Sequence, residues 1–185
     1  MKLPEINVRR FKALLTKLHA CPEAVKWARG KSSDEAYRTC RRADWMLWML
    51  VQQIGQPGWM THQQVVLLAC ACAKRALKHV PAGGNRPRLA IEAARRWAAD
   101  STEVNRAAAT TAGNFASWAA WEAYAMAAAA WAPSDAWWAE IAAAAAARPP
   151  AAAGVGYAAR EHRAMCVAMR KMIRGFGDKA KEAKA

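Results

Sequence analysis

The segment DWMLWMLV at residues 44–51 decides how this chain folds. Every residue after Asp44 is large and apolar, so a helix through this segment is apolar nearly all round and must be buried on every side. An aspartate at the start of such a run is typical of a helix N-cap, and we assign that role to Asp44. We therefore expect this helix to form the centre of the core.

Capping signals and helical periodicity continue on both sides of this segment. Apolar residues share one helical face over residues 8–18, and Ser32 followed by Glu35 has the spacing of a capping box that opens another helix. Thr61 and Gln64 repeat that spacing at the start of a helix that we expect to reach about His79. No stretch alternates apolar and polar residues over the length of a strand. We therefore predict an all-α fold, a compact bundle of about seven or eight helices.

The second half of the chain keeps the helical pattern and is rich in alanine. Arg86-Pro87 has the form of a helix start, because proline is tolerated in the first turn. Small alanines let helices approach closely, and the ten tryptophans supply the bulk that fills the space between them. We expect helices in this half over about residues 86–99, 102–131, 133–148 and 155–174.

The length of 185 residues favours one domain with a single core. We predict this domain over residues 1–175, divided into halves at 20–99 and 100–175. A flexible basic tail is expected at residues 176–185.

Cysteine usage and the N-terminus predict a reducing compartment. The five cysteines form an odd set without regular spacing, and the N-terminus lacks the apolar core of a signal peptide. The alanine-rich stretch at 107–147 is interrupted by charged residues and by Pro133, so we do not expect it to span a membrane. These observations predict a soluble protein of the cytosol.

The net charge of +14 is concentrated in three segments. Residues 1–42 carry +7, residues 74–96 carry +6 and residues 148–185 carry +6, whereas residues 97–147 carry −4. If the three basic segments converge in the fold, they form a surface that attracts anions. A well-solvated surface with a high isoelectric point is the alternative, and the sequence leaves both open.

The residues that could carry chemistry do not assemble into a catalytic or metal-binding set. Cys70 and Cys72 are two positions apart on a helix, so their side chains point to nearly opposite sides and buried structural thiols explain them better than a metal site. No serine is bracketed by glycines, and the glycine-rich loop at 83–86 lacks the lysine and hydroxyl of a nucleotide-hydrolysing loop. We therefore expect neither an enzyme nor a cofactor.

The helix predicted after residue 85 carries an arginine-rich face. Arg88, Glu92 and Arg95 fall within one arc together with Arg96, and Glu92 is placed to pair with an arginine four positions away. Such a pair orients a guanidinium for contact with a phosphate or carboxylate. The opposite arc holds Leu89, Ala93, Ala94 and Trp97.

The last predicted helix repeats this arrangement. Its basic side carries Arg160, Arg163, Arg170, Lys171 and Arg174, and its apolar side carries Met165, Cys166, Met169, Met172 and Ile173. An ordinary solvated surface explains both basic faces as well as an anion site does.

Three segments resemble the Imm-5-like family of small helical proteins, which are named as predicted toxin-immunity proteins and are also encoded by phages. They are CPEAVKWARG, RRADWMLWML and LACACAKRALKHVPAGGNRPRLAIEAARRWA. The resemblance covers about residues 20–99 and rests on the order of Cys21, Trp27, Ala43-Asp44-Trp45, Val80-Pro81, Arg86-Pro87-Arg88, Glu92 and Trp97.

This resemblance implies a stoichiometric antagonist, which neutralises a toxin or a host defence component by occupying it. It assigns Asp44, Arg86, Arg88 and Glu92 to a shared polar site, although a helix cap also explains Asp44 and a loop charge also explains Arg86. If the chain is phage-encoded, it would act in the cytosol of a bacterial host.

Two functional hypotheses lead. The first is a non-catalytic immunity or anti-defence protein that binds an acidic protein or a phosphorylated nucleotide; its sharpest form is a pocket of Arg86, Arg88 and Arg95 with Trp45 stacked on the base. The second is a nucleic-acid-binding protein that uses the basic helical surface. An enzyme is the third class, and a homo-oligomer stays open.

Overall fold

The computed structural model describes residues 3–80, 85–117, 128–129, 132–135, 137–146 and 156–182. Within these ranges every regular element is a helix and no strand occurs. The all-α fold that the sequence predicts is therefore confirmed.

The first helices form an N-terminal layer: α1 (Val8–Lys17), α2 (Pro22–Trp27) and α3 (Ser33–Thr39). The Ser32 hydroxyl accepts a hydrogen bond from the Glu35 N–H at 3.3 Å, so of the expected capping box only the half made by the Ser32 side chain is present. Ser33 then ties α3 to the start of the chain, because its hydroxyl accepts from the Ile6 N–H at 2.7 Å and donates to the Pro4 carbonyl at 3.3 Å.

The remaining elements are α4 (Ala43–Val51), α5 (His62–Lys74), the 3₁₀ helix η1 (Arg75–His79), α6 (Arg86–Ala99), α7 (Glu103–Ser117), α9 (Trp137–Ala146) and α10 (Tyr157–Glu182). The predicted capping box is complete at the start of α5, where the Thr61 and Gln64 side chains each accept from the backbone N–H of the other residue. The predicted start of a helix at Arg86-Pro87 is also confirmed.

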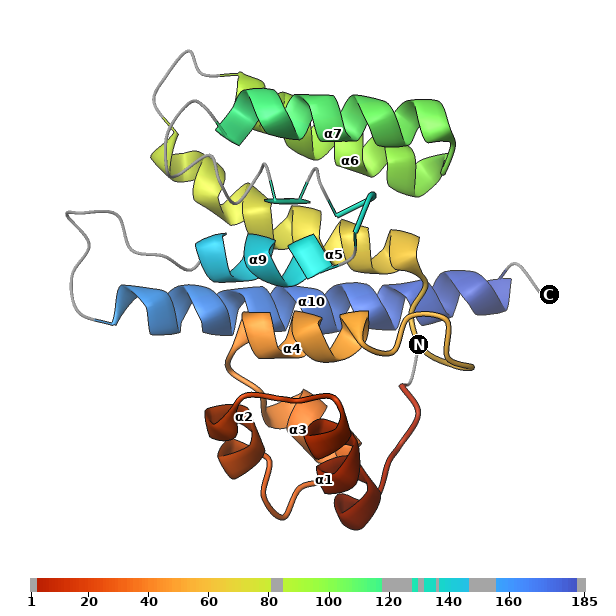
Figure 1. Cartoon of the computed structure of the whole chain (residues 1–185), viewed down its shortest axis with the longest axis vertical. Coiled ribbons are helices and arrows are strands. Elements are labelled where there is room, and N and C mark those ends of the chain that lie inside the picture. The colour runs from red at the N-terminus through yellow and green to blue at the C-terminus, as the bar shows by residue number, and fades with distance from the viewer. Residues whose placement is uncertain are drawn as a thin grey trace.

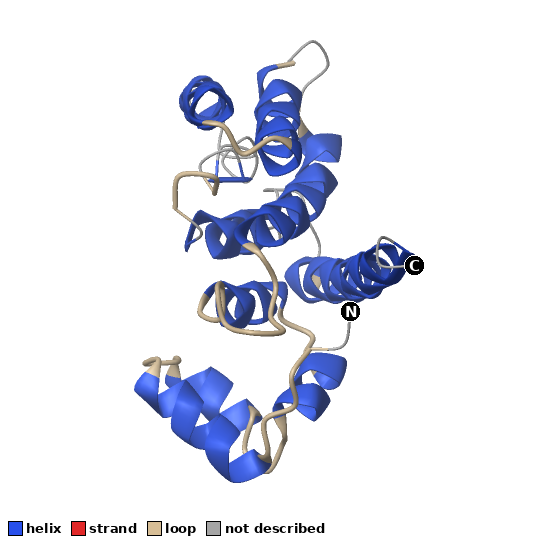
Figure 2. Cartoon of the chain, turned by 90° about the vertical axis from the view of Figure 1, so that its right-hand side faces the viewer, coloured by secondary structure: helices blue, strands red, loops and turns tan. Residues whose placement is uncertain are grey.

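The helices are stacked along the longest axis of the molecule (Figure 1). The N-terminal layer lies at one end, α4 and α10 lie next to it, and α6 and α7 lie at the other end. Between them, α9 packs against both α4 and α5, and α6 packs against both α5 and α7. Figure 2, turned by 90°, shows the same order. Residues on α6 and residues of the N-terminal layer are therefore at opposite ends of the stack.

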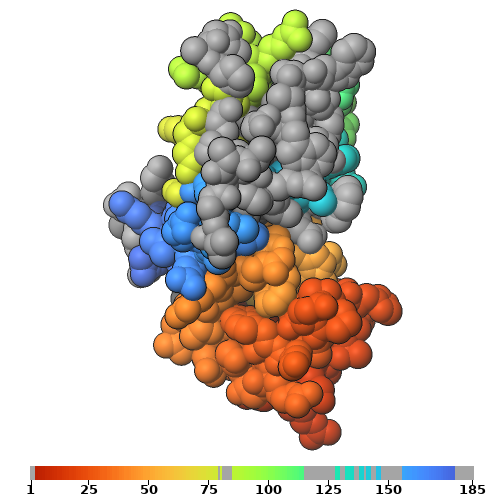
Figure 3. Space-filling view, turned by 90° about the vertical axis from the view of Figure 1, so that its left-hand side faces the viewer, coloured from red at the N-terminus to blue at the C-terminus, as the bar shows by residue number. Residues whose placement is uncertain are grey.

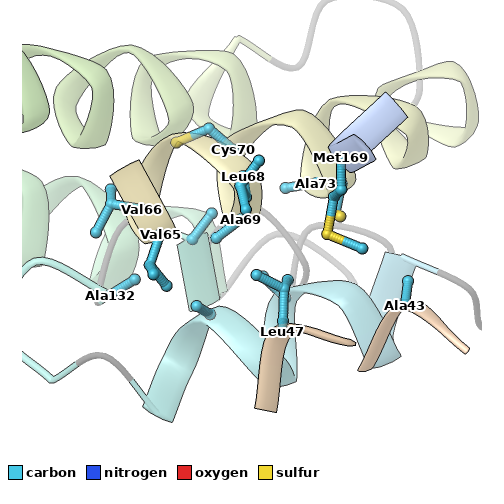
Figure 4. Packing of buried hydrophobic residues seen from close by; sticks show 14 of the residues in the cluster. Ala43, Leu47, Val65, Val66, Leu68, Ala69, Cys70, Ala73, Ala132 and Met169 are labelled. Atoms are coloured by element: carbon cyan, nitrogen blue, oxygen red, sulfur yellow. The ribbon is translucent and has the colours of Figure 1, made fainter. Parts of the chain in front are cut away.

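The core lies where α4, α5 and α10 meet. Leu47 of α4 and Met169 of α10 are fully buried, and Figure 4 shows Leu47 pointing toward Ala69 of α5 and Met169 lying between Ala73 and Ala43. Alanines at these contacts let the helices approach closely, as the composition predicts. The apolar segment at residues 44–51 is thus the centre of the core.

Four details differ from the sequence predictions. The predicted N-cap role of Asp44 is wrong, because α4 begins at Ala43 with Arg42 at the N-cap and Asp44 lies in the first turn, where its charge favours the helix N-terminus. The helix expected to continue to His79 changes to a 3₁₀ helix at Arg75. Leu89 was placed with the buried Ala93, Ala94 and Trp97 in the arc opposite the arginines, but it is 47% exposed.

The fourth difference is the end of the chain. The last helix was expected to end near Arg174 and to give way to a flexible tail from residue 176, but α10 continues to Glu182. Phe176 is half-buried against the main core, which favours continuation of the helix beyond Arg174.

The alanine-rich half is described only in part. The long helix predicted over about 102–131 begins as α7, and its tryptophans Trp118, Trp121 and Trp131 lie outside the described residues. The helix predicted after Pro133 is α9, on which Trp138 packs half-buried against the core. Among the described residues, no helix has the length and apolar character needed to cross a bilayer.

Candidate functional site

The arginines predicted on the helix after residue 85 lie on the exposed side of α6. Arg86, Arg88 and Arg95 are exposed, and so is Glu92. Within the described part of the chain Glu92 makes no ion pair, although Arg88 and Arg96 lie four positions to either side. The shared exposed arc is present, but the ion pair expected to orient these guanidinium groups is not formed.

Asp44 lies in a buried polar cluster between α4 and α10 and is 8% exposed. The Arg42 guanidinium donates two hydrogen bonds to it, Nε to Oδ1 at 3.0 Å and Nη2 to Oδ2 at 2.5 Å. On the other side His162 of α10 accepts a hydrogen bond at Nδ1 from the Ala43 N–H at 3.2 Å, with that nitrogen 3.6 Å from the Asp44 carboxylate. The Asp44 carboxylate is therefore occupied by Arg42, and the polar link between α4 and α10 is the hydrogen bond from the Ala43 N–H to His162.

His162 is neutral in this arrangement. It is 9% exposed, and this burial lowers the pKa of the imidazole even though Asp44 opposes the shift. An Nδ1 that accepts a hydrogen bond carries no proton, so the proton of the neutral ring is on Nε2. His162 thus accepts the N–H of Ala43, the first residue of α4.

Trp45 follows Asp44 but faces the N-terminal layer. Its ring centroid lies 5.9 Å from that of Trp27 at an interplanar angle of 51°, and the Arg42 guanidinium lies 4.7 Å from the centre of the Trp45 ring. The α6 arginines are separated from it by the layer of α5 and α9 (Figure 1). The predicted pocket of Arg86, Arg88 and Arg95 with Trp45 is therefore not assembled.

Glu161 is a buried carboxylate that the sequence analysis did not single out. It is 6% exposed and accepts hydrogen bonds from Arg75 Nε at 2.7 Å and Lys78 Nζ at 2.6 Å, both on η1. Burial raises the pKa of this carboxyl, but the hydrogen bonds from Arg75 and Lys78 outweigh burial and the pKa lies below its usual value. In the sequence, Glu161 is recognisable only as an acidic residue within a basic helix face. This pattern does not reveal ion-pair partners that lie more than 80 positions away.

Helix α10 is where the basic segments meet. The second basic segment, residues 74–96, contacts α10 through the ion pairs of η1 with Glu161. The first basic segment, residues 1–42, contacts α10 through Arg170, which donates hydrogen bonds to the carbonyl of Tyr37 at 3.1 Å and to that of Cys40. Figure 3 shows the start of α10 in blue between chain regions in yellow and orange. Arg160 and Arg163, predicted as site residues, lie exposed beside Glu161. The basic segments therefore converge along α10, but α6 lies in a separate layer.

A cavity of about 340 Å³ lies between the N-terminal layer and the pair α4 and α10. Its wall is mainly aromatic and aliphatic, and the charged side chains in it are Asp34, Arg38, Arg170 and Arg174. The aromatic residues in the wall are Phe11, Trp27, Tyr37, Trp45, Trp48 and Trp59. Trp45 is the one predicted site residue that lines this cavity.

Tyr37 contributes an unsatisfied hydroxyl to this region. The hydroxyl oxygen is buried and has no hydrogen-bond partner among the described residues. Burial raises the pKa of Tyr37 to about 12, although the charges of Arg170 and Arg174 oppose the shift. A buried polar group without a partner costs about 1–3 kcal/mol of stability, so this hydroxyl is an exception that needs a reason.

Four of the five cysteines, Cys40, Cys70, Cys72 and Cys166, are buried structural thiols, whereas Cys21 is exposed. Burial raises the pKa of Cys70 and of Cys72 to about 12, and both are essentially inaccessible, as expected. A hydrogen bond between the thiols of Cys40 and Cys166 lowers the pKa of Cys40 and raises that of Cys166. No cluster of histidine, cysteine and carboxylate side chains suited to a metal ion occurs among the described residues.

The fold and these sites define an all-α basic protein with two polar joints at α10 and an aromatic cavity beneath it. No protein family, no curated protein and no solved structure matches the chain. These comparisons give no guide to the function, which is therefore argued from the residues of the chain.

Proposed function

We propose that this chain is a non-catalytic binding protein that neutralises a toxin or a host defence component by occupying it. The partner is anionic, either an acidic protein surface or a phosphorylated nucleotide. The exposed arginines of α6 and α10 make the contacts. The resemblance to the Imm-5-like family supports the immunity role, and the charge distribution of the described residues supports the choice of partner.

One observation carries the proposal: the arginines predicted to bind a partner are exposed, whereas the buried carboxylates are paired with other cations. Asp44 is occupied by Arg42, and Glu161 is occupied by two residues of η1. Arg88, Arg95 and Arg163 are exposed and have no carboxylate partner in the described part of the chain. Guanidinium groups in this state can donate paired hydrogen bonds to carboxylate or phosphate oxygens of another molecule.

The test compares the wild-type chain with the double variant Arg88→Ala/Arg95→Ala as baits for partners from the cytosol of the cell in which the chain naturally occurs. Each lost charge-assisted contact weakens a specific complex by about tenfold. Stability should stay within about 0.5 kcal/mol of wild type, because both side chains are exposed. Lys12→Ala removes an exposed cation of α1, at the opposite end of the stack, and is the matched control. A partner retained equally by all three proteins contradicts the proposal.

A nucleic-acid-binding protein is the second candidate. The observation that favours it is the row of exposed cations along α10, with Arg160, Arg163 and Lys171 on the longest helix that the structure describes. For a DNA duplex, the logarithm of the affinity falls linearly with the logarithm of the salt concentration, with a slope near the number of phosphates contacted. This candidate would be favoured if the chain binds a short DNA duplex with such a salt dependence and does not bind an acidic protein or a nucleotide more tightly than the duplex.

A further inference from the structure

The cavity between the N-terminal layer and α4 is built like a site for a small molecule. Its volume of about 340 Å³ falls in the range of small-ligand sites, which are mostly apolar and carry a few polar groups. Trp27 and Trp45 present tilted rings in this wall, and Trp48 adds another flat surface from α4. A planar aromatic ring is the shape that packs best against such a wall.

The charge in the cavity wall is concentrated on α10. Asp34 and Arg38 form an ion pair at 2.9 Å, so together they add no net charge. Arg170 and Arg174 are one helical turn apart on α10, and both act electrostatically on Tyr37. Because the Tyr37 and Cys40 carbonyls fix the Arg170 guanidinium, the positive end of the cavity has a fixed position.

The unpaired hydroxyl of Tyr37 belongs to this positive end. It lies in a wall residue next to both arginines, and its buried oxygen lacks a hydrogen-bond partner among the described residues.

We propose that this cavity binds a small planar aromatic acid, with its ring against Trp27 and Trp45 and its anionic group at Arg170 and Arg174. This inference deepens the proposed function, because it rests on an anionic partner and names the class of small anion and its place. A phosphorylated nucleotide belongs to that class, since its base is planar and its phosphate is anionic.

The experiment uses two fluorescent probes of the same shape. 1-Anilinonaphthalene-8-sulfonate carries an anionic group, and N-phenyl-1-naphthylamine is its neutral counterpart. We expect saturable one-to-one binding of the sulfonate to the folded protein, tighter than that of the neutral amine. Arg174→Gln should weaken the sulfonate about five- to tenfold, the effect of one charge-assisted contact, and should leave the amine within about twofold.

Filling the cavity tests its location. Ala28→Leu and Ala36→Leu enlarge buried wall residues on different segments, so one remains informative if the other does not fold. Each folded variant, verified by its cooperative thermal transition, should lose at least tenfold in affinity for both probes. Ala13→Leu, on the exposed side of α1, is the control and should bind both probes as wild type does.

Three outcomes overturn the proposal: no saturable binding of the sulfonate, equal affinity for both probes in wild type and Arg174→Gln, or unchanged binding in both folded filling variants. The Arg88→Ala/Arg95→Ala variant separates this site from the surface of α6, because it should bind the sulfonate normally. If partner capture fails while the probe result holds, the proposed surface is wrong and the cavity site stands.

Discussion

Replacing Glu161 by glutamine tests the joint between η1 and α10. Glutamine keeps the shape of the side chain but removes the charge that pairs with Arg75 and Lys78. Two fully buried charge-assisted hydrogen bonds would contribute about 3–6 kcal/mol. The side chains of Arg75 and Lys78 are 36% and 49% exposed and regain water when released, so we expect a loss of about 2 kcal/mol. For a chain of this length that corresponds to a fall in Tm of about 4–8 °C.

Urea unfolding at neutral and acidic pH measures this effect. Because the pKa of Glu161 is lowered in the folded protein, its contribution is present above the unfolded value of 4.5 and is lost as the pH falls through the folded pKa. The difference between wild type and Glu161→Gln should therefore shrink at acidic pH. Glu103→Gln, in an exposed pair with Arg106, is the control and should change stability by less than about 0.5 kcal/mol. A Glu161→Gln effect as small as that of Glu103→Gln, or one independent of pH, refutes the reasoning.

Three further predictions concern a buried leucine, the Tyr37 hydroxyl and the cysteines. Leu47→Ala should destabilise the chain by about 2–5 kcal/mol in urea unfolding, because Leu47 is fully buried where α4 meets α5. Tyr37→Phe should raise the free energy of unfolding by about 1 kcal/mol, since it removes a buried hydroxyl without a partner; a loss of stability would show that the hydroxyl is satisfied. In the native protein iodoacetamide should modify exposed Cys21 but not Cys70 until unfolding, and mass spectrometry of the peptides would expose any early Cys70 adduct.

Much of the fold followed from local sequence signals. The apolar run at 44–51, the capping box at Thr61 and Gln64 and the start at Arg86-Pro87 each depend on residues within a few positions of one another, and all three are found in the structure. Periodicity also placed Met169 on the buried side of the last helix.

The candidate site was less predictable, because it depends on contacts between distant segments. Asp44 had the local signature of a cap, but its carboxylate pairs with Arg42 in a buried cluster instead. Trp45 and the α6 arginines both had suitable chemistry, and only the stacking order of the helices shows that they are not neighbours. Glu161 was missed for the same reason, since its cations come from η1.

The proposed function is that the chain binds an anionic partner and does not change it chemically. The most direct measurement is to purify the chain at low ionic strength from its natural cell, denature it by heat and identify the released molecules by mass spectrometry. We expect one acidic protein or one phosphorylated nucleotide, at about one per chain and chemically intact. Release of mixed nucleic-acid fragments, of a chemically altered product, or of no bound molecule would contradict it.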